Sequence, residues 1–288
     1  LAAKYQWARQ HLLTANYSFN NFDRKNRSYL QSSSRITDFS IPKKTTKHIA
    51  GLSYHFTPSR LWNIVAFGKY YRENVEGPVS QNADGIGGYV NRRMSSDALS
   101  VFPLRGVQTK FSYEKAYRLP TITELFGDDD MESGRANLKP EMSHNFNINL
   151  SYDHSFGPHA LYAEVGGVLR NTRDFIRRTI QSVSGTYYGA YENHGKVRTM
   201  GYTLSLRYRL GQWLSVGGTF NDIAAKDRER SLSANSGQRS LHYNVRMPNM
   251  PYRYGTADVV LRWVGLGAPA NTLTFTYNLN YQHEFPLY

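Results

Sequence analysis

Long stretches of the chain alternate between apolar and polar side chains. The clearest example is residues 197–210, where Met200, Leu204 and Tyr208 alternate with Thr203 and Ser205. Because successive side chains of a β-strand point to opposite faces, this period of two predicts a strand with one apolar and one polar face. Eleven such strands are predicted, at residues 8–22, 46–56, 62–70, 89–101, 107–115, 142–154, 160–172, 197–210, 213–226, 252–264 and 271–285. The fold class is therefore all-β.

The connections between these strands alternate between short and long. Short turns are predicted near residues 57, 103, 156, 211 and 267, and long connections at 23–44, 73–88, 119–141, 173–196 and 227–251. Short turns at one rim and long loops at the other are typical of outer-membrane barrels, whose strands need about 9–11 tilted residues to cross a bilayer. A soluble β-sandwich favours strands of about five or six residues. We therefore predict an antiparallel transmembrane β-barrel.

The charge balance indicates an anionic partner. The 288 residues contain 35 Lys and Arg against 22 Asp and Glu, a formal charge of +13, and no cysteine. No apolar run approaches the roughly 18 residues of a membrane helix. Much of the positive charge lies in the connections, at residues 24–27, 42–44 and 226–230, and not along a strand face. This placement suits the phosphates of lipopolysaccharide better than a nucleic acid, which would favour a basic and aromatic surface along the strands.

Several segments resemble one protein family. YRLPTITELFG (117–127) followed by NLKPE (137–141) is similar to the paired signature in the barrel of TonB-dependent outer-membrane receptors. YENHGKVRTMG (191–201) resembles a later step of the same barrels, and RMPNMPYRYGTADV (246–259) resembles a segment of their Bacteroidetes members. Together the matches cover about residues 106–285. The chain is therefore similar to a Bacteroidetes-type TonB-dependent receptor or transporter.

The resemblance implies a larger architecture than these residues provide. Barrels of the family have about twenty-two strands, within the range known for outer-membrane barrels, around an N-terminal plug that contacts TonB. The eleven predicted strands would correspond to strands nine to nineteen. Residues 1–288 are thus expected to form part of one receptor β-barrel domain, with the plug domain absent and the last strands missing.

The function implied by the resemblance is TonB-dependent import of a scarce nutrient through the outer membrane of a Gram-negative bacterium. A ferric siderophore or similar metal chelate is the favoured substrate, and SusC-like glycan import or cobalamin import is the alternative. Pro140 stands where the glycan importers usually carry Trp, which argues against a glycan. The implied partners are TonB through the missing plug, outer-membrane lipid and lipopolysaccharide, the small-molecule or metal-chelate substrate and a surface lipoprotein. A basic secreted β-protein that binds nucleic acid or carbohydrate is the alternative of another class.

Candidate ligand-binding residues lie in or beside two of the long connections, which the alternation of loops brings to the same rim. They combine aromatic rings, which stack, with side chains that form charge-assisted hydrogen bonds, as a bulky and partly anionic ligand requires. These residues are Tyr117, Arg118, Phe126, Arg135, Tyr187, Tyr188 and His194. In the alternative interpretation, the tyrosines belong to the aromatic girdle at the membrane interface and Arg118 braces its own loop.

Two further arginines lie on the polar face of residues 197–210. Arg207 and Arg209 are predicted to line the lumen, where they would accompany an anionic substrate. Alternatively, they pair with carboxylates on neighbouring strands.

The sequence contains no clear catalytic or metal-binding motif. Asp128, Asp129, Asp130 and Glu132 could offer oxygen ligands to Ca²⁺, but they lack the EF-hand spacing and fit a solvated loop tip better. The nine His residues include no HExxH pair, and no GxSxG sequence is present. We therefore expect no enzyme activity, no cofactor and no metal site.

Overall fold

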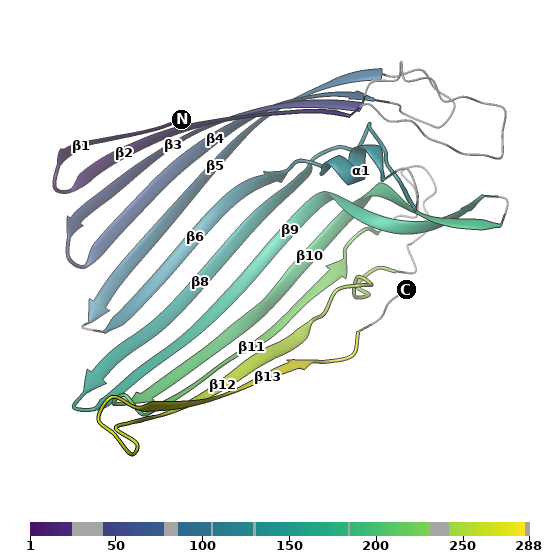
Figure 1. The fold of residues 1–288 in the computed structure, drawn as a ribbon. Helices are drawn as coiled ribbons and strands as arrows, with labels where there is room; N and C mark the ends of the chain where they lie inside the picture. Colours follow the sequence, from purple (N-terminus) through teal and green to yellow (C-terminus); the bar gives the residue numbers. More distant parts are fainter. Residues whose placement is uncertain are drawn as a thin grey trace.

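The computed structural model describes residues 1–24, 43–77, 86–104, 106–128, 131–183, 185–230 and 242–285, with the backbone alone for residues 24, 77, 86–104, 183 and 186. These residues form one 13-stranded sheet that bends into a trough (Figure 1). Apart from β7, the strands lie side by side in chain order from β1 at one edge to β13 at the other, each antiparallel to its neighbour. The predicted all-β, antiparallel architecture is confirmed.

The strands are considerably longer than those of an average soluble sheet. Their bounds are β1 Ala2–Ala8, β2 His11–Arg24, β3 Lys43–Ser59, β4 Trp62–Gly77, β5 Ile86–Leu104, β6 Val107–Arg118, β7 Glu132–Ser133, β8 Glu141–Phe156, β9 His159–Val183, β10 Thr186–Leu210, β11 Leu214–Asp227, β12 Arg253–Val264 and β13 Thr272–Gln282. One short helix, α1, spans Ile122–Phe126.

The predicted count of eleven strands is too low, because β1 and β7 were not predicted. β1 pairs with β2 from Ala2↔Asn16 to Ala8↔His11, and Gln6 lies beside a register shift. Its few residues provide too little alternation to be recognised alone. β7 is a two-residue strand that pairs in parallel with Gly189 and Ala190 of β10, a contact that no local pattern encodes.

The predicted long connection at residues 173–196 is wrong. β9 and β10 continue through it as a hairpin that projects beyond the neighbouring strands (Figure 1) and turns at Gly185, whose φ of 84° an L side chain rarely adopts. The ion pair between Arg177 and Glu192, 2.7 Å between Nη2 and Oε1, joins registered partners in this extension. The cross-strand backbone bonds satisfy polar groups that an irregular loop would expose.

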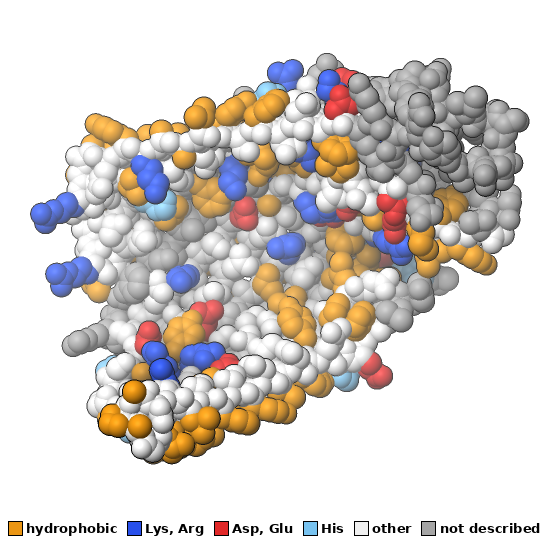
Figure 2. Space-filling view, in the orientation of Figure 1, with side chains coloured by type: hydrophobic (Ala, Val, Ile, Leu, Met, Phe, Trp, Pro, Cys, Tyr) orange, Lys and Arg blue, Asp and Glu red, His pale blue; other side chains and the backbone are white. Residues whose placement is uncertain are grey.

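The two faces of the sheet differ as the alternation predicts. On β10, Met200 is 59% exposed and Leu206 57%, whereas Thr203 and Ser205 between them are half-buried. Figure 2 shows apolar side chains along the outside of the trough and charged side chains in its hollow. A continuous apolar outer face of this kind suits contact with hydrocarbon, since soluble proteins rarely expose large apolar patches.

The described connections are sorted between the two rims, and the buried core lies at only one of them. The short turns, such as Gly157-Pro158 between β8 and β9, gather at one end, and α1 lies at the other (Figure 1). There Val75 of β4, Ile176 of β9 and Leu125 of α1 share one apolar cluster. Strands so far apart in the sheet meet only across its concave side, so the helix lies inside the trough. No helix among the described residues is long and apolar enough to cross a membrane.

Candidate functional site

The loop after β6 begins with a capped helix. The Thr121 hydroxyl accepts a hydrogen bond from the Glu124 amide at 3.3 Å, and Glu124 Oε2 accepts one from the Thr121 amide at 2.7 Å. This reciprocal capping box satisfies amide groups that have no partner inside a helix, so it stabilises even this five-residue helix. Residues Thr121-Ile122-Thr123-Glu124 of the family signature therefore have a local structural role.

Arg118 at the end of β6 fastens both ends of this loop. Its guanidinium lies 3.0 Å from Glu124 Oε2 on α1 and 2.9 Å from Glu141 Oε2 at the start of β8. Glu141 Oε1 also accepts a hydrogen bond from the Ile176 amide of β9 at 2.7 Å. The hydrogen bond with Glu141 raises the pKa of Arg118. We call the Arg118–Glu124–Glu141 set the latch, and it matches the bracing alternative for Arg118.

Apolar contacts hold α1 against distant strands. Leu125 is 1% exposed and Phe126 is 5% exposed. The Phe126 ring stacks on Phe22 of β2, with 6.2 Å between centroids. On the same side of the trough, Lys47 Nζ lies 2.9 Å from Glu73 Oε1 and donates to the Pro120 carbonyl at 3.2 Å. Phe126 is thus a core residue, and its predicted ligand contact has no support in the geometry.

Asn193 of β10 fixes the second part of the signature. Its side-chain Oδ1 accepts a hydrogen bond from the Lys139 amide, and its Nδ2 donates to the carbonyls of Lys139 and Asp174, all at 2.8–2.9 Å. The segment NLKPE and the segment YENHG therefore lie together, although they are far apart in sequence. Beside them, His194 Nε2 lies 2.8 Å from Asp227 Oδ2 of β11. His194 thus links strands and does not line the hollow described next.

A hollow of about 540 Å³ lies on the concave side next to the latch. A row of registered residues crosses five strands on its wall, namely Glu114 of β6, Asn145 of β8, Arg170 of β9, Thr199 of β10 and Ala225 of β11. We call it the polar row. Asn145 is 6% exposed, and no donor among the described residues reaches its Oδ1. Because a buried polar atom without a partner is costly, this oxygen is poised to receive a donor from a ligand or another segment.

Two of the seven predicted ligand-binding residues line this hollow, and the other five are not among its lining residues. Tyr117 and Arg118 line the hollow, and Tyr254 lies across from them. Tyr187 is 72% exposed on the projecting hairpin, and the Tyr188 hydroxyl there donates to Gln181 Oε1 at 3.3 Å.

The remaining predicted residues of the loop between β6 and β8 form contacts within the loop or with the adjacent hairpin. Arg135 Nε donates to Asn137 Oδ1 at 2.9 Å. Glu132 pairs with Arg178 at 2.8 Å, and Asp128 Oδ1 accepts from the Met131 amide. Residues 129 and 130 lie outside the described residues. Within the described ranges, no three His, Asp or Glu side chains gather as metal ligands.

Arg207 lies on the concave face and pairs with a carboxylate. Its Nη2 is 2.9 Å from Asp258 Oδ1 on β12, two strands away, and Gly217 of β11 lies between them in the register. A Cβ on Gly217 would lie 2.6 Å from the guanidinium, so the missing side chain opens this path. Arg209 is exposed, opposite Ser215. A role in substrate passage stays a prediction for both arginines.

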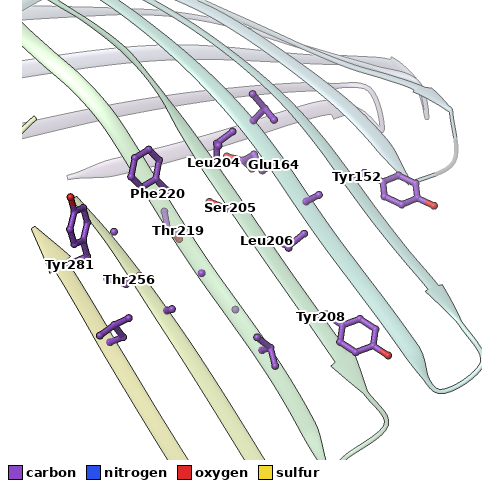
Figure 3. Close-up of a pocket in the computed structure, with 18 of the residues that line it drawn as sticks. Tyr152, Glu164, Leu204, Ser205, Leu206, Tyr208, Thr219, Phe220, Thr256 and Tyr281 are labelled. Carbon is purple, nitrogen blue, oxygen red and sulfur yellow. The ribbon is translucent and has the colours of Figure 1, made fainter. Parts of the chain in front are cut away.

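A larger hollow of about 720 Å³ lies on the outer face (Figure 3). Leu204, Leu206 and Tyr208 of β10 line it, together with the small residues Gly218 and Gly255. These side chains belong to the exposed apolar face, and its lining is almost entirely apolar. We therefore assign this hollow to the lipid-facing surface and not to a substrate site.

Sequence reasoning did not single out Arg170, Asn145 or Tyr254. Arg170 and Asn145 do alternate onto the polar faces of predicted strands, a signal that marks them as inward-facing. The pattern does not show that their strands are neighbours in this register, and so it cannot assemble the row.

The comparisons with known proteins agree with this architecture. Residues 98–285 match the family model described as "TonB dependent receptor-like, beta-barrel". A comparison with curated proteins found no match.

Solved structures of large outer-membrane proteins superpose on most of the chain. The copper transporter OprC does so with a TM-score of 0.70 and 14% identity, covering 90% of this chain and 41% of its own. The FrpB iron transporter from Neisseria meningitidis (F3-3 variant) has a TM-score of 0.62 and 17% identity, covering 91% of this chain and 39% of its own. The Serratia marcescens hemophore receptor HasR, a double mutant in complex with its hemophore HasA and heme, has a TM-score of 0.61 and 16% identity, covering 96% of this chain and 52% of its own. The chain thus spans about half of these proteins or less.

The family model covers more than half of the chain, and the fold is a single sheet of long antiparallel strands, as part of a β-barrel requires. The chain belongs to the TonB-dependent receptor β-barrel family, whose members lie in the outer membrane of Gram-negative bacteria.

Proposed function

We propose that residues 1–288 form part of the wall and mouth of a receptor that imports a metal chelate, most simply a ferric siderophore. Substrate binds at the rim that carries α1, and TonB, acting through a plug domain, drives its passage through the lumen. The chain contributes binding and passage surfaces and no catalysis. The Bacteroidetes-type assignment from residues 246–259 stays a prediction, as does a partnership with a surface lipoprotein.

The polar row is the observation that carries this proposal. Arg170 offers a guanidinium to an anionic chelate, and Asn145 Oδ1 offers an acceptor that is otherwise unused. Tyr117 and Tyr254 add aromatic surface to the same hollow. A large, partly anionic and partly aromatic ligand needs charge-assisted hydrogen bonds and stacking surface together. The names of the similar structures, which mention copper, iron and heme, support a metal-containing substrate.

The latch determines which residues are suitable for a test. Arg118 pairs with two carboxylates, so replacing it would disturb the loop as well as any ligand contact. Arg170 and Asn145 carry no such brace among the described residues and are better probes. Tyr187 and Tyr188 test the projecting hairpin separately.

The experiment uses the full-length receptor in outer membranes. Uptake of radiolabelled iron as siderophore chelates is compared with uptake of cobalamin and of oligosaccharides, for the wild type and for Arg170→Ala, Asn145→Ala and Tyr187→Ala. Loss of one charge-assisted hydrogen bond should weaken chelate binding by about tenfold in Arg170→Ala. Arg60→Ala, in the turn at the opposite rim, is the matched control and should behave as the wild type.

Gel mobility before and after heating shows whether each variant is folded. Wild-type affinity in a folded Arg170→Ala and Asn145→Ala receptor would exclude the polar row as the binding surface. If the receptor takes up cobalamin or oligosaccharide and not iron chelates, the proposed substrate class is wrong.

A further inference from the structure

Six positively charged residues gather at the rim that carries α1, four of them on the neighbouring strands β9, β10 and β11 and two, Arg228 and Arg246, in the segment that follows β11. The register places Arg173 of β9 opposite Lys196 of β10, whose carbonyl accepts a hydrogen bond from the Arg228 amide at 2.7 Å. Two residues further along β10, Arg198 lies opposite Lys226. The backbone of Lys226 in turn forms an isolated antiparallel β-bridge with Arg246. The two rows, Arg173–Lys196–Arg228 and Arg198–Lys226–Arg246, are called the cation ladder.

The ladder continues the outward, lipid-facing side of the sheet. Lys196 and Arg198 share the face of Met200 and Tyr202 on β10, and the intervening Val197, which points into the trough, is only 2% exposed. Arg173, Lys196, Arg198 and Arg246 are exposed, while Lys226 and Arg228 are half-buried. The charges therefore begin where the apolar band of the outer face ends.

No carboxylate neutralises this charge within the described residues. None of the six residues has an acidic partner within 4.0 Å there. Of the nearby acids, Glu229 lies beside Gly195 and its Oε1 accepts a hydrogen bond from the Arg230 amide at 3.2 Å. Asp227 is 3% exposed and pairs with His194, and Asp222 pairs with Arg253 at 2.8 Å. Like charges directly opposite each other across strands destabilise a sheet. An arrangement of this kind is expected where an external anion supplies the missing charge.

Two arginines of the ladder are held in place by aromatic rings. The Arg246 guanidinium lies 3.7 Å from the centroid of the Tyr252 ring, and that of Arg228 lies 5.7 Å from the Tyr243 ring. Arg228 Nε is buried and has no acceptor among the described residues. Hydrogen bonds from Arg230 and Arg228 lower the pKa of Tyr243, which fits a region of uncompensated positive charge. Stacked guanidinium groups are well suited to bind phosphate in a fixed geometry.

We propose that the cation ladder binds the phosphate groups of lipopolysaccharide, the phosphorylated glycolipid of the outer leaflet. The apolar side chains of the same strands lie in hydrocarbon, so charges directly beyond them lie at the height of the lipid head groups. A site for free inorganic phosphate would not need to lie next to the apolar band, whereas a site for lipid phosphate would. The proposal depends on the family's outer-membrane location and not on the imported substrate.

The test measures lipid binding to the purified full-length receptor in detergent by native mass spectrometry. Bisphosphorylated lipid A, dephosphorylated lipid A and inorganic phosphate are the three probes. The triple variant Lys196→Gln, Arg198→Gln and Lys226→Gln should bind bisphosphorylated lipid A about a hundredfold more weakly than the wild type. The matched control, Lys4→Gln, Arg9→Gln and Arg60→Gln, removes three exposed cations from the short-turn end of β1–β4 and should bind like the wild type.

Stability provides a second readout that a merely structural ladder would not reproduce. Without lipid, the triple variant should unfold at a higher denaturant concentration than the wild type, because repulsion has been removed. Added bisphosphorylated lipid A should stabilise the wild type and leave the variant unchanged. The proposal is overturned if the variant keeps wild-type affinity, fails to fold, or if dephosphorylated lipid A or inorganic phosphate binds the wild type as well as bisphosphorylated lipid A does.

Discussion

The loop-bearing rim and the strand wall of this protein are stabilised in different ways. At the rim, Leu125 and Phe126 are buried and the latch joins α1, β8 and β9 through charged hydrogen bonds. In the wall, the large apolar side chains of the interior strand β10, such as Met200 and Leu206, are more than half exposed and point away from the trough. The rim buries its apolar side chains against one another, whereas the apolar side chains of the wall depend on the surrounding lipid.

This difference shows which substitutions each region tolerates. A close-packed interior resists any added atom, because neighbouring backbone cannot move aside at low cost. A wall in contact with lipid tolerates changes of shape but not of polarity. Added atoms should therefore destabilise the rim most, and added charge should destabilise the wall most. Matched residues in each region provide the controls.

The largest expected effect is that of Gly127→Ala at the rim. Gly127 has a φ of 69°, and a Cβ there would lie 2.1 Å from the Glu132 carbonyl oxygen. Strain and overlap together should reduce the free energy of unfolding of the full-length receptor by about 4 kcal/mol, measured by denaturant titration in detergent. Gly157→Ala is the control, because Gly157 also has a positive φ but nothing lies within 4 Å of its Cβ position. It should cost about 1 kcal/mol, and equal losses would contradict the close packing of the rim.

The wall is tested by charge at two adjacent positions of β10. Leu204→Arg places a guanidinium on the apolar outer face and should destabilise the receptor by about 3 kcal/mol. Ser205→Arg points into the trough and should change stability little. Unfolding in lipid vesicles measures both. Equal costs would refute the assignment of the two faces.

A smaller loss is expected when the latch is opened by Glu141→Ala. This change removes the acceptor of Arg118 and of the buried Ile176 amide, which should cost about 2 kcal/mol. Glu192→Ala breaks an ion pair of similar length with Arg177, in which both side chains are about a third exposed. That control should lose about 0.5 kcal/mol. Limited proteolysis of the loop at residues 119–140 provides an independent readout, and a protected loop in Glu141→Ala would disprove the latch.

The smallest effect is expected for Asp258→Asn inside the trough. The pair with Arg207 is partly exposed, so its loss should change the free energy of unfolding by less than about 1 kcal/mol. Uptake is the more informative measurement. A freed Arg207 should bind an anionic substrate more tightly and slow its release, whereas unchanged uptake kinetics would leave Arg207 a structural partner of Asp258 alone.

Much of the wall could be predicted from the sequence. Residues 197–210 of β10 and the residues of β13 alternate so regularly that their strand structure and their two faces follow directly. Even β5, where Arg92, Arg93 and Asp97 interrupt the apolar face, forms a full strand between β4 and β6. The sequence predicts a loop at residues 173–196 because polar residues occur at both sets of alternating positions there, although Ile176 of this hairpin is buried in the apolar cluster.

The site was less accessible to sequence reasoning. Tyr117 and Arg118 are predicted from their place beside a long connection, but Arg118 also braces that loop. Arg170 and Asn145, which line the hollow, belong to no recognisable motif. Their importance arises only where β6, β8 and β9 come into register.

The sequence by itself determined the strands, their apolar and polar faces and the sorting of most connections, because these depend on neighbours two residues apart and on local turn chemistry. Only the tertiary structure decided that α1 lies inside the trough, that Arg207 reaches Asp258 across Gly217, and that the residues of the polar row and the cation ladder lie side by side. Those arrangements depend on which strands pair and in which register. Backbone hydrogen bonding over the whole sheet sets the register, and a one-residue slip would move every side chain to the other face.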